Sequence, residues 1–263
     1  MPSRTAQRRD SARRAQAAIA QAASDAAARR RRRYAGLLAL LAALVVAVAV
    51  IASGGGGAPA TAAGGAPVAG AAYVHELLAG IPQHGLVLGA ANAPVRMVEF
   101  ADLQCPYCDE FARQALPSLI DRYVRPGKLS IEFRNLSFIG PDSVRAGLIA
   151  AGAEEQNKLW DLVELMYLNQ GEENTGYATT AYLHRLLAAI PGLEVARAEQ
   201  ASRTPQAAAM LSAATATATA DGVGGTPTFL VARAGAAPQL FQPSSLTPAP
   251  FATEVDSLLG GRR

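Results

Sequence analysis

Cysteine and histidine are scarce in this chain. Its 263 residues contain two cysteines and three histidines, and the histidines stand isolated from one another at positions 75, 84 and 184. A structural zinc ion normally takes four cysteine or histidine ligands. So small a set of ligands argues against a zinc site, and we expect the protein to work without a metal or another cofactor.

Positive charge is also scarce once the first 34 residues are set aside. Residues 1–34 hold ten of the 24 basic residues and only two acidic ones, whereas the rest of the chain has 14 basic and 19 acidic residues, a net charge of −5. The basic pI therefore belongs to the tail, and we expect no nucleic-acid binding by the main part of the chain. The tail itself is rich in alanine and is predicted to be a frayed helix or disordered.

Charge is absent altogether from residues 35–52, an apolar run of 18 residues. As a helix this run would be about 27 Å long, close to the thickness of a bilayer core. The five arginines at 29–33 predict a cytoplasmic tail over residues 1–34 and an extracytoplasmic domain after the span. A cleaved signal peptide is the alternative, but its apolar region is usually only ~7–15 residues long. We therefore predict an uncleaved, single-pass anchor in the cell membrane.

Residues 53–72 are mostly Gly, Ala and Pro, which predicts a flexible linker without a core. A folded domain is expected over residues 73–263, a length sufficient for one hydrophobic core. Within it, no strong strand pattern appears at about 134–225, where helices are predicted over residues 143–156, 158–169, 177–190 and 206–220. Strands are predicted at 86–88, 95–100, 128–133 and 239–242, with helices at 74–81 and 247–259.

The two cysteines stand in a Cys-Pro-Tyr-Cys run between the strand at 95–100 and an amphipathic helix. Cys105 lies where that helix should begin, so unpaired backbone N–H groups and the helix dipole favour its thiolate. Pro106 suits the first helical position, whereas Pro117 should kink the helix further along. The strand at 128–133 then completes a βαβ unit with a parallel pair.

Three other interpretations of the cysteine pair are a plain structural disulfide, half of a zinc site, and chance. A disulfide across so short a loop gains little loop entropy, so redox chemistry is the better explanation. A second motif, Gly-Gly-Thr-Pro-Thr-Phe-Leu-Val at 224–231, places Pro227 at the start of a strand. We predict a cis bond between Thr226 and Pro227, although only about 5–6% of X–Pro bonds are cis.

Together these segments resemble the thioredoxin superfamily and, within it, the DsbA family of extracytoplasmic thiol-disulfide oxidoreductases, in particular its membrane-anchored bacterial branch. The resemblance covers about residues 73–263 and is carried by residues 80–108, Leu116, Pro117, and the segments 127–135 and 225–231. It implies an α/β thioredoxin-like fold with a helical insertion at about 134–225.

The resemblance also implies roles for single residues. Cys105 would be the attacking, more exposed thiol and Cys108 the buried resolving thiol. Pro227 would face them as the cis-proline, and the backbone of Thr226 would pair with a substrate strand. Glu99 matches a buried acid beneath the active site in this family, where it would relay a proton to or from Cys108. The alternative for Glu99 is an acid at a strand edge that reaches solvent.

The function expected from this resemblance is the oxidation of secreted proteins outside the cytoplasm, where disulfides persist. Pro106 and Tyr107 would tune Cys105, while the charges of Asp109 and Glu110 oppose its thiolate, so a lowered pKa short of the extreme is expected. The expected partners are secreted or membrane proteins with cysteine thiols and a membrane redox partner that resets the site. The alternatives are a reductase or isomerase of the same fold, or a membrane-tethered binding or chaperone module without redox turnover.

Overall fold

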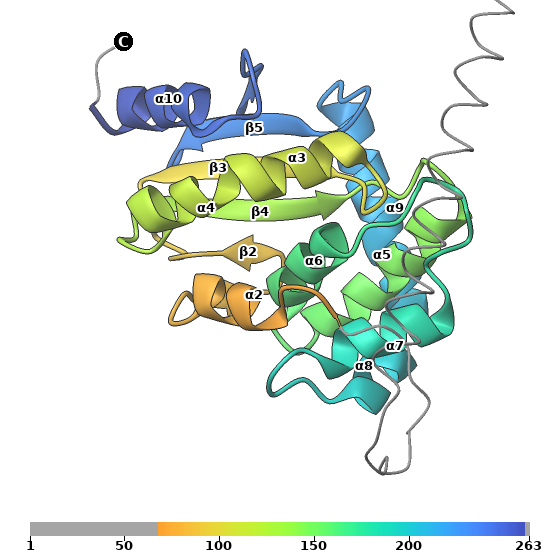
Figure 1. Ribbon diagram of the computed structural model, residues 1–263. Coiled ribbons are helices and arrows are strands. Elements are labelled where there is room, and N and C mark those ends of the chain that lie inside the picture. Colours follow the sequence, from red (N-terminus) through yellow and green to blue (C-terminus); the bar gives the residue numbers. More distant parts are fainter. Residues whose placement is uncertain (1–67, 261–263) are drawn as a thin grey trace, which may run out of the picture. The chain divides into compact units, whose positions relative to one another are not determined.

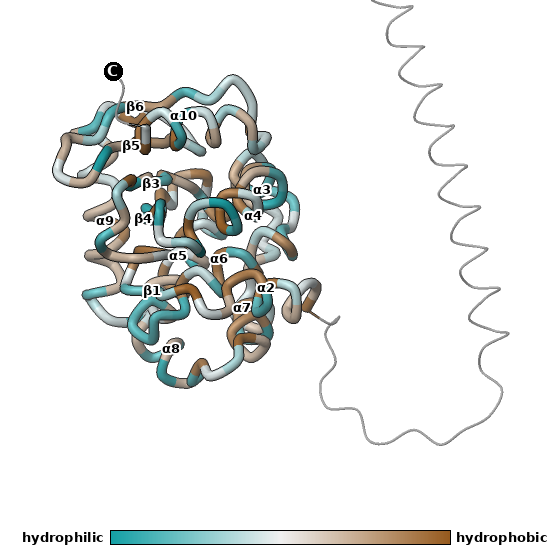
Figure 2. Tube along the Cα trace, turned by 90° about the vertical axis from the view of Figure 1, so that its left-hand side faces the viewer, coloured by the Kyte–Doolittle hydropathy of each residue, from teal (hydrophilic) through white to brown (hydrophobic). Residues whose placement is uncertain are grey.

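The computed structural model describes residues 68–260. The predicted tail at 1–34, the membrane anchor at 35–52 and most of the linker at 53–72 lie outside the described residues. Within residues 68–260, no helix has the length and apolarity needed to cross a membrane. Hydrophobic and hydrophilic residues alternate at short intervals along this part of the chain (Figure 2).

The described residues form one sheet in the order β1-β2-β4-β3-β5-β6. Its strands are β1 (Gln83–His84), β2 (Val87–Leu88), β3 (Val95–Ala101), β4 (Leu129–Asn135), β5 (Thr228–Arg233) and β6 (Gln239–Phe241). Only β3 and β4 pair in parallel, and the other neighbours are antiparallel. The predicted βαβ unit is confirmed, whereas the two-residue strand β1 was not predicted from the sequence.

Alternation along β3 divides its side chains between two cores, because successive residues of a strand point to opposite faces. Val95 and Met97 belong to the large hydrophobic cluster, while Phe100 belongs to a small one with Leu230. Helix α3 (Pro106–Gln114) packs in the large cluster and α9 (Pro205–Ala220) in the small one. Figure 2 shows β3 between these two helices, and Figure 1 shows α3 in front of the sheet.

The helix after the cysteines is broken, as Pro117 predicts. Helix α3 is followed by α4 (Leu116–Leu119) and by the π-helical turn Ile120–Val124. A proline inside a helix has no N–H for the carbonyl one turn before it, and its ring crowds that carbonyl. Gly127 ends the segment with a φ of 72°, a left-handed conformation that glycine adopts without strain.

Five helices separate β4 from β5. They are α5 (Pro141–Glu154), α6 (Leu159–Leu168), α7 (Thr180–Ala188), α8 (Val195–Ala201) and α9. The four predicted helical runs are present, and α8 was not predicted. The close approach of α8 to α5 depends on Gly152 of α5, because a Cβ at position 152 would lie only 2.1 Å from the Ala198 carbonyl oxygen of α8. In α9 the hydroxyls of Thr215, Thr217 and Thr219 bond to carbonyls one turn back, so its Thr-Ala repeat stays helical.

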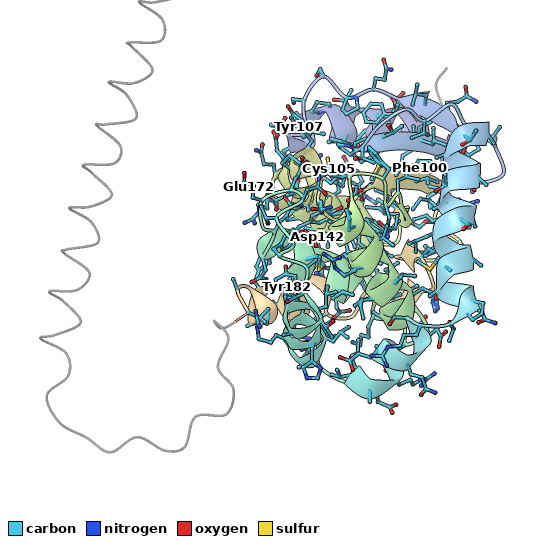
Figure 3. The ribbon with its side chains drawn as sticks, turned by 90° about the vertical axis from the view of Figure 1, so that its right-hand side faces the viewer. Phe100, Cys105, Tyr107, Asp142, Glu172 and Tyr182 are labelled. Carbon is cyan, nitrogen blue, oxygen red and sulfur yellow. The ribbon has the colours of Figure 1, made fainter. Side chains whose placement is uncertain are left out.

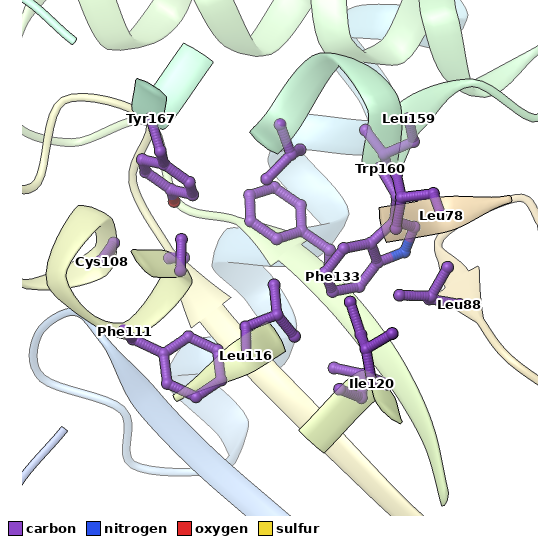
Figure 4. Packing of buried hydrophobic residues seen from close by; sticks show 14 of the residues in the cluster. Leu78, Leu88, Cys108, Phe111, Leu116, Ile120, Phe133, Leu159, Trp160 and Tyr167 are labelled. Carbon is purple, nitrogen blue, oxygen red and sulfur yellow. The ribbon is translucent and has the colours of Figure 1, made fainter. Parts of the chain in front are cut away.

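The two terminal helices of the described region complete the core. Helix α2 (Ala71–Leu78) starts three residues before the predicted helix and packs against α6. Helix α10 (Pro248–Gly260) contributes Phe251, which contacts Phe111 and Phe229 with ring centroids 5.0 and 4.9 Å apart. Trp160, whose spacing with the apolar residues after it is more typical of a core than of a substrate patch, is fully buried beside Phe133 (Figure 4).

Candidate active site

Both cysteines lie at the N-terminus of α3, as the sequence predicts. Cys105 is the N-cap residue with extended backbone, and Pro106 occupies the first helical position. The first turn closes with a 3.1 Å hydrogen bond from the Asp109 N–H to the Cys105 carbonyl. Tyr107 is 63% exposed, so its side chain points outward at the site (Figure 3).

The two thiols differ little in exposure. Cys105 is 4% exposed and Cys108 fully buried, and neither forms a disulfide in this structure. Cys105 is more exposed than Cys108, as predicted, but the difference in exposure is small because other parts of the chain cover both sulfurs. What separates the two thiols is the set of groups around each of them.

The segment that contains Pro227 reaches the cysteines across 121 residues of sequence. The Cys105 Sγ lies 3.4 Å from the Thr226 carbonyl oxygen, to which the protonated thiol donates. The bond between Thr226 and Pro227 is cis, as predicted. Beside it lies a cavity of about 440 Å³ whose lining includes Tyr107, Pro227, Phe229 and Phe241. The structure therefore brings together the cysteine motif and the proline motif.

The pKa of Cys105 is lowered to about 6. The largest cause is a hydrogen bond with the Cys108 thiol. Burial opposes this effect, while hydrogen bonds with the Thr226 side chain and with the backbone of Cys108 and Tyr107 lower the pKa further. This value lies within the expected range of ~3.5–7.5 for such motifs. Asp109 pairs with Arg113, its Oδ1 accepting from Nε at 2.5 Å, so its charge is partly neutralised beside the thiols.

The pKa of Cys108 shifts in the opposite direction. Burial raises its pKa well above the ordinary value, and the hydrogen bond and negative charge of Cys105 add to the rise. The Tyr167 ring lies close above Cys108, and its hydroxyl donates to the Asp102 carbonyl at 3.3 Å (Figure 4). At neutral pH the site therefore favours a thiolate on Cys105 and a thiol on Cys108.

Glu99 is buried beneath the cysteines, so the alternative of an acid that reaches solvent is wrong. Its side chain is on the large-cluster face of β3, between Phe133 of β4 and Phe229 of β5 in the register. It is 2% exposed, and its Oε1 accepts no hydrogen bond. Burial raises the pKa of Glu99 to about 8, and the negative charge of Cys105 contributes. A neutral carboxyl at this place can give a proton to a thiolate.

Several polar residues that hold the cysteine loop were missed by sequence reasoning. The Asp102 carboxylate accepts from the Gln104 N–H at 2.8 Å and the Ser143 hydroxyl at 2.6 Å. Gln104 Oε1 in turn accepts from the Asn174 N–H at 2.8 Å, and Gln170 Nε2 donates to the Cys105 carbonyl at 3.2 Å. Asp102 and Gln104 stand out in the sequence as polar residues after a buried strand, but nothing there points to Gln170, which comes from a distant acidic loop.

No group of three or more His, Cys, Asp or Glu side chains that could hold a metal ion occurs among residues 68–260.

The chain matches the family model described as thioredoxin over residues 82–237, more than half of its length. The chain belongs to the thioredoxin family. The comparisons support the sequence resemblance to the DsbA-like thiol-disulfide oxidoreductases.

Individual relatives agree with this assignment. The probable disulfide bond formation protein D of Bacillus cereus is 34% identical over 94 residues, which cover 35% of this chain and 44% of that protein. The match thus spans less than half of the relative. Among solved structures, oxidised BdbD from Bacillus subtilis has a TM-score of 0.60 at 20% identity and covers 69% of this chain and 98% of its own. Wolbachia pipientis alpha-DsbA1 has a TM-score of 0.58 at 19% identity, and the alignment covers 71% of this chain and 96% of that protein. Both similarities concern the fold.

Proposed function

We propose that this protein is an extracytoplasmic thiol-disulfide oxidoreductase that oxidises the thiols of secreted or membrane proteins with its Cys105–Cys108 pair. The observation that carries the proposal is the contrast between the two thiols. The pKa of Cys105 is lowered to about 6, whereas that of Cys108 is raised. Cys105 is 4% exposed and Cys108 0% exposed, and Cys105 lies beside a carbonyl from a distant segment. A low-pKa thiol is the better leaving group in thiol-disulfide exchange.

Catalysis starts from the disulfide between Cys105 and Cys108. A substrate thiolate attacks the Cys105 sulfur, the enzyme disulfide breaks, and a mixed disulfide forms while Cys108 leaves as a thiolate. Glu99, neutral below about pH 8, gives its proton to Cys108. A second substrate thiolate then attacks the substrate sulfur of the mixed disulfide and Cys105 leaves as a thiolate. The substrate loses two electrons, the enzyme gains them, and Glu99 recovers a proton from solvent.

The stabilised Cys105 thiolate supports the oxidising direction. An oxidant needs its reduced form stabilised, and each ~30 mV of potential corresponds to about 1.4 kcal/mol for this two-electron couple. The donors around Cys105 favour the reduced form, since hydrogen bonds to charged groups contribute about 1.5–3 kcal/mol each. We therefore propose a potential more oxidising than thioredoxin's ~−270 mV.

The remaining roles are proposals of the same kind. The half-buried Thr226 backbone beside the cysteine loop would pair with an extended substrate strand, and Pro227 would hold that backbone against Cys105. Pro106 starts the helix whose N–H groups face the thiolate, and the outward-facing Tyr107 borders the cavity into which a substrate would fit. A membrane redox partner would return the cysteines to the disulfide, and residues 35–52 would keep the enzyme at the membrane.

Refolding of reduced ribonuclease by the purified full-length chain tests the activity. We expect recovery of ribonuclease activity with the wild type and none with a Cys105→Ser variant. Equilibration against glutathione then gives the potential. A potential near that of thioredoxin, with reduced cysteines in cells, would favour a reductase, and a chain without any exchange activity would favour a binding or chaperone module.

A further inference from the structure

Asp102 lies at the start of the cysteine loop, residues 102–105 between β3 and α3, and is fully buried although it carries a carboxyl group. Its Oδ1 accepts from the Gln104 N–H at 2.8 Å and from the Ser143 hydroxyl at 2.6 Å. Its Oδ2 accepts from the N–H groups of Phe138 and Ile139 at 3.0 and 3.1 Å. Burying a carboxylate is costly unless donors surround it, as they do here. A simple turn does not need so costly a residue, so a further role is expected.

The donors to the Asp102 carboxylate come from separate segments of the chain. Gln104 belongs to the cysteine loop itself. Phe138 and Ile139 lie in the loop after β4, and Ser143 lies in the first turn of α5. The Asp102 side chain therefore fastens the start of the cysteine loop to segments that are 36 to 41 residues away in sequence. These bonds leave the backbone at position 102 little freedom to move.

The backbone of Asp102 contacts both cysteines. Its carbonyl accepts from the Cys105 N–H at 3.0 Å and from the Tyr167 hydroxyl at 3.3 Å. Burial raises the pKa of Cys108 most strongly, and a backbone hydrogen bond from Asp102 opposes that rise. A hydrogen bond that lowers the pKa of a thiol is one that its thiolate accepts, so the Asp102 N–H donates to the Cys108 sulfur. The two peptide groups that flank the Asp102 Cα thus face one cysteine each.

Other titratable groups face Cys108 from α3, β3 and α6. After burial, the hydrogen bond and charge of Cys105 and the charge of Glu99 oppose the ionisation of Cys108. Tyr167 lies close above Cys108, and burial followed by the charge of Cys108 raises the pKa of the Tyr167 hydroxyl (Figure 4). Burial and both acids therefore oppose a negative charge on Cys108, whereas the Asp102 N–H favours it.

We propose that Asp102 is a positioning residue of the redox reaction: its carboxylate holds its own backbone N–H at the Cys108 sulfur, where that N–H stabilises the thiolate that leaves when the enzyme disulfide opens. A substrate thiolate forms a bond to the Cys105 sulfur, and the electron pair of the broken disulfide goes to Cys108. The hydrogen bond acts on this charge before Glu99 gives its proton. The inference rests on the proposed function only in taking Cys105 as the attacked sulfur.

Opening of the disulfide in the oxidised full-length chain by reduced glutathione tests the proposal. Asp102→Asn replaces a carboxylate oxygen with an amide group that donates instead of accepting, so the backbone at position 102 should lose its hold. Disulfide opening should slow about tenfold, as expected for the loss of a hydrogen bond to a charged group. Acid quenching and mass spectrometry follow the reaction. An unchanged or faster opening, as expected if only the charge of Asp102 mattered, would overturn the proposal.

Attack by Cys105 on oxidised glutathione separates this role from a general loosening of the loop. In the Cys108→Ser background the attack has no Cys108 leaving group, so Asp102→Asn should leave its rate unchanged. Equal slowing of both steps would mean that Asp102 only holds the loop in place, and the proposal would be wrong.

Ser143→Ala provides a second variant if Asp102→Asn fails to fold. It removes one donor to Asp102, keeps the carboxylate, and should slow disulfide opening roughly threefold without slowing attack by Cys105. The control Ser137→Ala removes a neighbouring hydroxyl that bonds to the Ser143 carbonyl and to Asn135, and it should change neither rate. An unchanged opening rate in a folded Ser143→Ala chain would contradict the proposal. The expected pattern of rates without any ribonuclease refolding would count against the proposed function alone.

Discussion

The two faces of the sheet divide the work of this protein. On one face the large cluster holds both cysteines together with helices α3, α6 and α10, and it encloses Glu99 and Glu164. On the other face Phe100, Leu136 and Leu230 pack with Ala214 and Ala218 of α9 in a small cluster. Figure 3 shows Phe100 toward α9 and Cys105 on the far side of the sheet from it.

Neighbouring residues of β3 show what the difference teaches. Glu99 and Phe100 are adjacent in sequence, yet one enters the redox site and the other the α9 core. Burying polar groups without partners is unfavourable, so they accumulate where the largest amount of apolar burial offsets that cost. The comparison predicts that changes on the α9 face alter stability alone, whereas changes on the cysteine face alter both stability and redox behaviour.

The largest effect is expected at the cysteines. Cys105→Ser should abolish ribonuclease refolding, because the attacked sulfur is missing. Cys108→Ser should instead accumulate mixed disulfides on Cys105, since no resolving thiol remains beside it; non-reducing gels and mass spectrometry identify the adducts. Ser212→Ala on the exposed side of α9 is the control and should keep full activity. Adducts found on Cys108 in the Cys105→Ser chain would reverse the assignment of roles.

The next effect compares two fully buried phenylalanines, one on each face. Phe111→Ala and Phe100→Ala should each lower the free energy of unfolding by about 3–5 kcal/mol. Phe111 should be the costlier loss, because its ring contacts Phe229 at 4.7 Å and Phe251 at 5.0 Å, whereas the cluster around Phe100 is small. Urea titration measures both changes.

The same pair of variants separates the faces in redox terms. Phe111 follows Cys108 by three residues on α3, so Phe111→Ala should also move the reduction potential, while Phe100→Ala should leave it unchanged. Equal shifts of the potential in both variants would contradict the division between the faces.

The pH dependence of the reduction potential comes third. The pKa of Cys105 is about 6 in the folded protein, against 9.0 for an ordinary thiol. Below pH 6 reduction takes up two protons, and the potential should fall by about 59 mV per pH unit; above it the thiolate persists, and the fall should be about 30 mV per unit. Because the pKa is depressed, the stability that the thiolate gives the reduced protein is present above pH 9 and is lost as the pH falls through 6. Glutathione equilibria at several pH values measure this, and a single slope from pH 4 to 8 would refute it.

The smallest effect is expected at Tyr107. Tyr107→His places an imidazole beside the N-terminus of α3, and below its pKa of ~6.5 the imidazolium should stabilise the Cys105 thiolate. We expect the pKa of Cys105 to fall and the potential to rise by about 30 mV for each tenfold gain in favour of the reduced form. Tyr107→Phe keeps the ring without a charge and should change neither quantity. Ultraviolet titration of the thiolate measures the pKa, and an identical pKa in the histidine variant would contradict the prediction.

Patterns in the sequence determined the elements that depend on neighbouring residues. The strand at β3, the helix start at Pro106, the break at Pro117 and the parallel β3–β4 pair follow from short-range periodicity, proline geometry and the length of the crossover. The DsbA-like resemblance followed from these elements in their order. The two-residue strand β1 and helix α8 were not predicted, because both are too short to show a hydrophobic periodicity. Strand β1 pairs with β2, and α8 packs against α5 and α7.

The tertiary structure alone decided the chemistry of the site. Cys105 meets Thr226 across 121 residues, and Gln170 reaches the same cysteine from the loop after α6. The burial of Glu99 and of Glu164 cannot be read from a strand or helix pattern, since an acid on an element faces solvent unless other elements cover it. A pKa depends on the dielectric and charges that distant segments bring to a group, and these exist only once the chain has packed.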